Sequence, residues 1–73
     1  MKFNPAEITV HKGDTIVFEN KDLVAHDVTE EKDKAWTSGL LAPNASWKMV
    51  ADKNNDYFCS IHVVMKGKIR IEQ

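Results

Sequence analysis

The segment from Cys59 to Met65 constrains this chain more than any other, because it carries a thiol, an imidazole and a thioether at even spacing. The three side chains belong to Cys59, His62 and Met65, in the pattern Cys-x-x-His-x-x-Met. Two histidines and a cysteine in a plane, with a long axial methionine, are the ligands of a blue-copper site. The fold must therefore bring a second histidine to this segment from elsewhere. The candidates are His11 and His26.

The length and charge of the chain exclude several other classes of protein. We predict a single domain over residues 1–73, and a domain of this size buries only about 60% of its unfolded surface, so a bound metal is one usual means of stabilisation. One cysteine excludes an internal disulfide. Ten basic residues against 11 acidic residues give no basic surface for nucleic acid. No apolar run approaches the roughly 18 residues of a membrane span.

Alternating apolar and polar residues predict several short strands and no helix. Turn-forming residues around Gly13, at 20–22 and at 52–56 separate the strands, and the charged run 30–34 is predicted to be a solvated loop. Residues 36–43 are expected to form a loop or a short edge segment. Short strands separated in this way are typical of a β-sandwich or barrel. The strands are expected over residues 7–10, 15–20, 23–29, 46–51, 57–59 and 68–72.

Several segments together resemble the cupredoxin (blue copper protein) family, most closely its amicyanin- and plastocyanin-type electron carriers. The short spacing between His62 and Met65 is that of the amicyanin group. The resemblance implies an all-β, Greek-key antiparallel β-sandwich of about six or seven strands that lacks the usual first strand. It would leave a sheet edge open, through which a homo-oligomer could form. The segments are Phe3-x-Pro5, Ile8-Thr9-Val10-x-x-Gly13-Asp14-Thr15, Phe18-x-Asn20-x-Asp22, His26-Asp27-Val28-Thr29, Ser38-Gly39-Leu40-Leu41-Ala42-Pro43, and Tyr57-x-Cys59-x-x-His62-x-x-Met65-x-Gly67.

The resemblance also implies a set of ligands for one copper ion that cycles between Cu(I) and Cu(II). It selects His26 rather than His11, which lies in a Lys-Gly-Asp turn where a solvated histidine is expected. Family members often carry asparagine after the first ligand histidine. Asp27 stands there in this chain, and we expect it to brace the cysteine loop by hydrogen bonds. The implied metal ligands are His26, Cys59, His62 and Met65.

These residues favour a type 1 copper electron-transfer protein that is not an enzyme. Phe58 and Ser60 flank Cys59, so no adjacent histidine links the site to a second, catalytic copper. A binuclear purple centre would need a second cysteine. His62 is expected to be the more exposed histidine, with redox partner proteins docking around it. The docking patch is predicted to comprise Leu40, Leu41, Pro43, Val63 and Val64.

Two other functions remain open on the sequence alone. A copper-binding or copper-delivery protein would use the same ligands without a redox partner. A β-sandwich interaction module would bind no metal at all. A nucleophile–base pair of Cys59 and His62 is disfavoured because nothing nearby offers an oxyanion hole.

Copper thiolates persist best outside the reducing cytosol, so the resemblance implies a periplasmic or extracellular location, although no signal peptide is seen in this chain.

Overall fold

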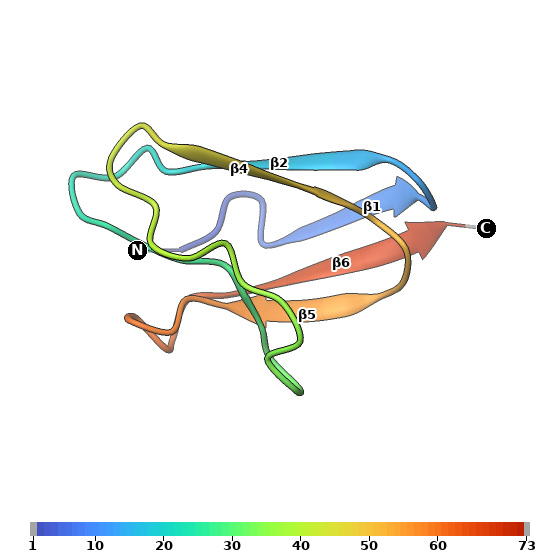
Figure 1. The fold of residues 1–73 in the computed structure, drawn as a ribbon. Helices are drawn as coiled ribbons and strands as arrows, with labels where there is room; N and C mark the ends of the chain where they lie inside the picture. The colour runs from blue at the N-terminus through green and yellow to red at the C-terminus, as the bar shows by residue number, and fades with distance from the viewer. Residues whose placement is uncertain (1, 73) are drawn as a thin grey trace.

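The computed structural model describes residues 2–72, which form six strands in two facing layers (Figure 1). The all-β, two-sheet architecture predicted from the sequence is confirmed. Nowhere in residues 2–72 is there a helix long and apolar enough to cross a membrane. The strands are β1 (Glu7–His11), β2 (Thr15–Glu19), β3 (Thr29–Glu30), β4 (Ser46–Val50), β5 (Asn55–Phe58) and β6 (Lys66–Glu72).

One sheet contains four strands in the order β1-β6-β5-β3, and the other contains β2 and β4. All pairs are antiparallel except β1 and β6, which run parallel with Ile8 opposite Ile69. The expectation of a wholly antiparallel sandwich is therefore wrong for this pair. Parallel neighbours need a long crossover connection, and here β2 to β5 supply it, because β1 and β6 stand at opposite ends of the chain.

The strands form where apolar residues alternate, because alternate side chains point to opposite faces of a sheet. In β2, Ile16 and Phe18 turn toward the core while Val17 is exposed. Trp47 and Met49 do the same in β4. The turn that joins β1 to β2 requires Gly13, whose φ of 96° lies in the left-handed region that favours glycine.

Tyr57 is the centre of the core between the two sheets. Its ring meets Phe3 and Phe18 edge-on, with centroid distances of 4.8 and 5.2 Å. Gly67 lies opposite Tyr57 on β6, and a Cβ at this position would collide with the tyrosine ring. This burial raises the pKa of the Tyr57 hydroxyl. The other buried core side chains are Ile16, Val28, Leu41, Ala51 and Ile69.

The strand expected over residues 23–29 is wrong, since only Thr29 and Glu30 join a sheet there. His26 instead makes a single bridge to Leu41. The physical reason is Asn20, whose side-chain amide donates hydrogen bonds to the carbonyls of Val24 and Leu41 and so supplies partners that a sheet would otherwise provide. The extent of the domain over 1–73 stays a prediction, with residues 1 and 73 outside the described part.

Candidate metal centre

His26 is fixed from both its backbone and its ring. Its N–H donates to the Leu41 carbonyl at 3.1 Å, and the Leu41 N–H donates back at 2.7 Å. The side chain is buried, and its two nitrogens face different groups. Nδ1 lies 3.8 Å from Cys59 Sγ, whereas Nε2 lies 2.7 Å from Asp22 Oδ2. The structure therefore brings the distant histidine selected from the sequence to the single thiol.

Cys59 follows the last residue of β5, Phe58, so the hydrogen-bonded sheet determines where its side chain lies. The residue is 0% exposed and makes no disulfide. Its sulfur accepts a hydrogen bond from the Asp27 N–H at 3.4 Å. Such a bond stabilises negative charge on sulfur, which is the state in which a cysteine binds metal.

The short loop from Cys59 to Met65 is closed by its own backbone. The Cys59 N–H donates to the Met65 carbonyl at 3.0 Å, and the Met65 N–H donates to the His62 carbonyl at 2.8 Å. Met65 is buried directly before β6 and lines the same cavity as His26. The predicted axial donor and the predicted first histidine thus line one pocket.

Asp27 braces this loop from the neighbouring segment, as expected from the sequence. Its Oδ1 accepts the Ser60 N–H at 2.8 Å and the Thr29 hydroxyl at 3.1 Å. Its Oδ2 accepts the Ser60 hydroxyl in a short hydrogen bond. Because Asp27 is itself buried, these bonds tie the residue after Cys59 to the residue after His26.

His62 is the least enclosed of the four predicted ligands. Its ring packs against the ring of His26 with a centroid distance of 5.0 Å and an interplanar angle of 61°. Within residues 2–72, no three His, Cys, Asp or Glu side chains are grouped closely enough to hold a metal ion on their own. The participation of His62 beside His26 and Cys59 therefore stays a prediction. His11 is not part of the site, since it is exposed and pairs with Glu72 at 3.4 Å.

The residues present fit a copper ion. Metal bonds of about 2.3 Å to sulfur and about 2.0 Å to imidazole, as known for zinc, would place two donors in a trigonal plane about 3.7 Å apart. The 3.8 Å between Cys59 Sγ and His26 Nδ1 satisfies this condition. The donors are a thiol, imidazoles and a thioether, a combination that suits copper. The full assignment of four ligands stays a prediction.

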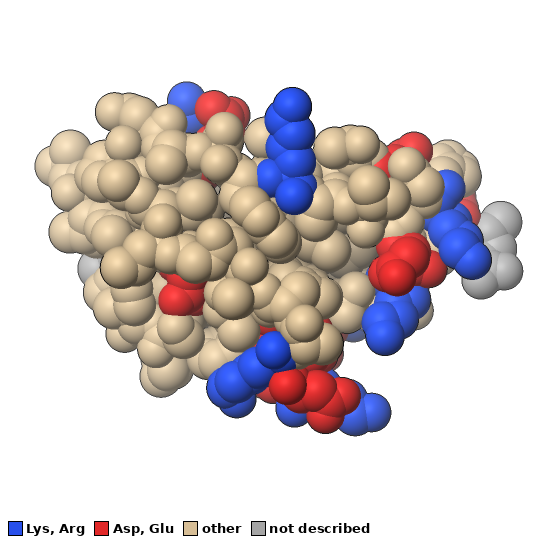
Figure 2. All heavy atoms as spheres, in the orientation of Figure 1, with Lys and Arg blue, Asp and Glu red and all other residues tan. Residues whose placement is uncertain are grey.

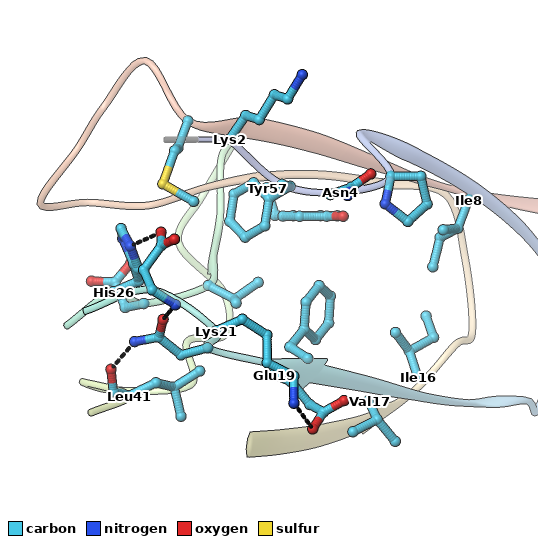
Figure 3. Close-up of a pocket in the computed structure, with 18 residues that line it drawn as sticks. Lys2, Asn4, Ile8, Ile16, Val17, Glu19, Lys21, His26, Leu41 and Tyr57 are labelled. Atoms are coloured by element: carbon cyan, nitrogen blue, oxygen red, sulfur yellow. Dashed lines mark hydrogen bonds and ion pairs between the residues drawn. The ribbon is translucent and has the colours of Figure 1, made fainter. Parts of the chain in front are cut away.

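A cavity of about 530 Å³ extends from this centre between the two sheets. Figure 3 shows His26 at one end of the cavity and Ile8 and Ile16 at the other, with Tyr57 along its wall. The lining is apolar toward Ile16 and polar toward His26. Two of the four predicted ligands, His26 and Met65, therefore border the same pocket as the core residues Ile16 and Tyr57.

Asn20 and Asp22 were part of the family resemblance, but no role at the site was predicted for either. From the residues alone, the segment 20–22 was interpreted as a break between strands, because no periodic pattern relates it to His26. A usable signal did exist, since ligand histidines commonly donate their second ring N–H to a carboxylate. A search for an acidic residue near His26 would have pointed to Asp22.

Comparisons with known proteins place this chain in a family. Residues 1–72 match the family model described as copper binding proteins of the plastocyanin/azurin family. The chain is 26% identical to amicyanin from Paracoccus versutus, covering 99% of this chain and 59% of that protein. It therefore spans well under two thirds of the length of this curated relative.

Solved structures show the same fold. A Cu(I) structure of an amicyanin mutant matches with a TM-score of 0.90 at 23% identity, covering 99% of this chain and 74% of the other. A purple cupredoxin from Nitrosopumilus maritimus matches with a TM-score of 0.89 at 19% identity, covering 97% of this chain and 82% of the other. The two-sheet fold and the shorter length of this chain are both consistent with the sequence prediction.

Proposed function

The chain belongs to the plastocyanin/azurin family of copper-binding proteins, and from that premise we propose that it is a type 1 copper protein that carries single electrons between redox partners. This family is one of small electron carriers and not of enzymes. One observation carries the proposal. His26 Nδ1 lies 3.8 Å from the buried Cys59 sulfur, and this cysteine begins the loop that also carries His62 and Met65.

The residues around the centre would keep its geometry nearly constant. Copper bound there would supply a one-electron couple between Cu(I) and Cu(II). Asp27 holds both the Cys59 sulfur and Ser60, and the backbone of Met65 closes the loop. A site held this way, between the geometries that the two oxidation states prefer, reorganises little on each transfer. Burial of Cys59 keeps water from the thiolate.

An apolar surface around His62 would serve as the docking patch. Val64 is 85% exposed and Leu40 is 70% exposed, and Val63 and Ile61 are also exposed. Figure 1 shows that the loop carrying Val63 and the loop after β2 reach the same end of the molecule, and Figure 2 shows this end largely without charged side chains. Weak redox encounters need only small interfaces, so a patch of this kind suffices.

The structure changes the membership of the predicted patch. Leu41 is buried in the core and is not available for docking. Leu23 and Ile61, which the sequence did not suggest, are 95% and 50% exposed. We define the docking patch as Leu23, Leu40, Pro43, Ile61, Val63 and Val64. The periplasmic or extracellular location remains part of the proposal, supported by the family and by the chemistry of copper thiolates.

Addition of one equivalent of Cu(II) to the purified apo-protein tests the proposed function. We expect an intense blue or green absorption and reversible voltammetry. His26→Ala and Cys59→Ser should each abolish the colour, whereas His11→Ala is the matched control and should retain it. Tight Cu(I) binding without a stable cupric thiolate would favour copper delivery instead. No binding of either ion would leave an interaction module.

A further inference from the structure

Asp22 contacts the ring of His26, although Asp22 does not belong to the predicted ligand set. Its Oδ2 lies 2.7 Å from His26 Nε2, on the side of the ring away from Cys59. The histidine side chain is buried, whereas the Asp22 side chain is 47% exposed. The carboxylate therefore covers the outer nitrogen of the ring and remains in contact with water.

Asn20 holds Asp22 in this position. The Asp22 N–H donates to Asn20 Oδ1 at 2.9 Å. The Asn20 amide donates to the carbonyls of Val24 at 2.9 Å and Leu41 at 2.8 Å, and its backbone N–H donates to Ala45 at 2.9 Å. Every polar group of this buried asparagine has a partner, so the loop carrying Asp22 is fixed to the segment that also pairs with His26.

The two contacts of the ring impose different roles on its nitrogens. A carboxylate can only accept a hydrogen bond, so Nε2 must carry the proton that lies between them. In the neutral ring, Nδ1 then has no proton, and its lone pair faces the Cys59 sulfur. Nδ1 is the nitrogen that could bind a metal held by Cys59.

We propose that Asp22 is a positioning residue that fixes the tautomer and orientation of His26 and favours Cu(II) over Cu(I) at the centre, an inference that rests on the proposed copper function. The carboxylate makes the imidazole a stronger donor. Its negative charge lies across the His26 ring from the copper site, and it stabilises Cu(II), which is the more highly charged oxidation state. A partner of this kind typically changes metal affinity by about 10–100-fold.

The first experiment needs no metal. ¹⁵N NMR of the apo-protein at about pH 8 reports the tautomer of His26. We expect a protonated Nε2 and an unprotonated Nδ1 in the wild type, and a mixture of both tautomers in Asp22→Leu. A wild-type ring with its proton on Nδ1, or an unchanged tautomer in Asp22→Leu, would overturn the inference.

The second experiment measures Cu(II) and Cu(I) affinities and the reduction potential. Asp22→Ala should weaken Cu(II) binding by about 10–100-fold and Cu(I) binding less, and each tenfold difference raises the potential of a one-electron couple by about 59 mV. Asp22→Asn keeps an acceptor for Nε2 and should retain the blue spectrum with a smaller rise. The matched control is Asp52→Asn, which removes an exposed charge from the 51–54 segment at the opposite end of the sandwich (Figure 1).

Potentials and affinities equal to those of Asp52→Asn in both Asp22 variants would refute the role of Asp22. Failure of the wild type to bind copper would instead refute the proposed function. The NMR result distinguishes the two failures, because it measures the ring of His26 without any metal.

Discussion

Asp27 shows how one side chain can connect two segments that meet at a site. Its carboxylate holds Ser60 through two hydrogen bonds and Thr29 through a third, while its own N–H donates to the Cys59 sulfur. The residue is buried, so a lost partner is not simply replaced by water. The shape of the cysteine loop therefore depends on a residue that need not bind the metal.

Replacement of Asp27 by alanine should destabilise the protein by about 2–3 kcal/mol, because it removes charged hydrogen bonds and leaves the Ser60 N–H without its acceptor. The free energy of unfolding measured in urea provides the check. Asp27→Asn keeps Oδ1 as an acceptor and should lose less than half as much. Equal losses in the two variants would show that charge, and not hydrogen bonding, explains the effect.

The turn after β3 depends on a single acceptor. Glu30 accepts the backbone N–H groups of Lys32 at 2.9 Å, Asp33 at 2.9 Å and Ala35 at 3.1 Å. The Ala35 and Asp33 N–H groups are the main cause that holds the pKa of Glu30 below its ordinary value of 4.5. The charged run 30–34 is thus a closed turn organised by its first residue.

The lowered pKa of Glu30 predicts a dependence of stability on pH. The unfolded chain binds a proton near pH 4.5 and the folded chain only at lower pH, so Glu30 contributes stability above pH 4.5. That contribution is lost as the pH falls through the folded pKa. Glu30→Gln should flatten this part of the stability profile in urea titrations between about pH 3 and pH 6. A profile identical to that of the wild type would contradict the prediction.

Alternation of side chains predicted β1, β2 and β4 well, because it reports which face of a strand is buried. It could not report which strand lies beside which, so the parallel pairing of β1 and β6 was missed. It also failed over residues 23–29, where Asn20 supplies hydrogen bonds from a side chain. The cysteine loop was identified from its spacing, whereas Asp22 was missed because its contact with His26 depends on the path of an irregular loop.

The whole molecule is a small sandwich with a site that could contribute to its stability. A chain of 73 residues buries only a small hydrophobic core, so its folded state is marginally stable. A ligand that binds only the folded state stabilises that state by mass action. The proposed centre would join the β5–β6 loop to the segment before β3, and β3 pairs with β5 at only two positions. Metal binding there would connect the two.

Loading with Cu(I) under anaerobic conditions should raise the melting temperature. At a free concentration about 1,000 times Kd the gain is about 4 kcal/mol, and each kcal/mol shifts Tm by about 4–8 °C in a domain of this size. Differential scanning calorimetry of the apo and loaded forms measures the shift. Cys59→Ser should lose most of it, and a loaded wild type that melts with the apo-protein would contradict the expectation.

The outer edge of β2 is the place where self-association is expected. In residues 2–72, β2 pairs only with β4, and the cavity opens along Ile16 to Asp22. Open edges pair readily with other strands. Sedimentation should therefore show a concentration-dependent dimer, and Val17→Lys, which places a charge on this edge, should reduce it. The control is Val64→Lys, which places the same charge at an exposed residue outside the sheets. A strict monomer at high concentration would rule out this pairing.

Complete burial of the only sulfhydryl has a practical consequence for the empty protein. An alkylating reagent such as iodoacetamide can reach Cys59 only when the loop opens, because the residue is 0% exposed. The rate of labelling in the native state, compared with that in urea, therefore measures the free energy of that opening. The same burial would keep newly folded chains from forming disulfide cross-links to one another before a metal is bound.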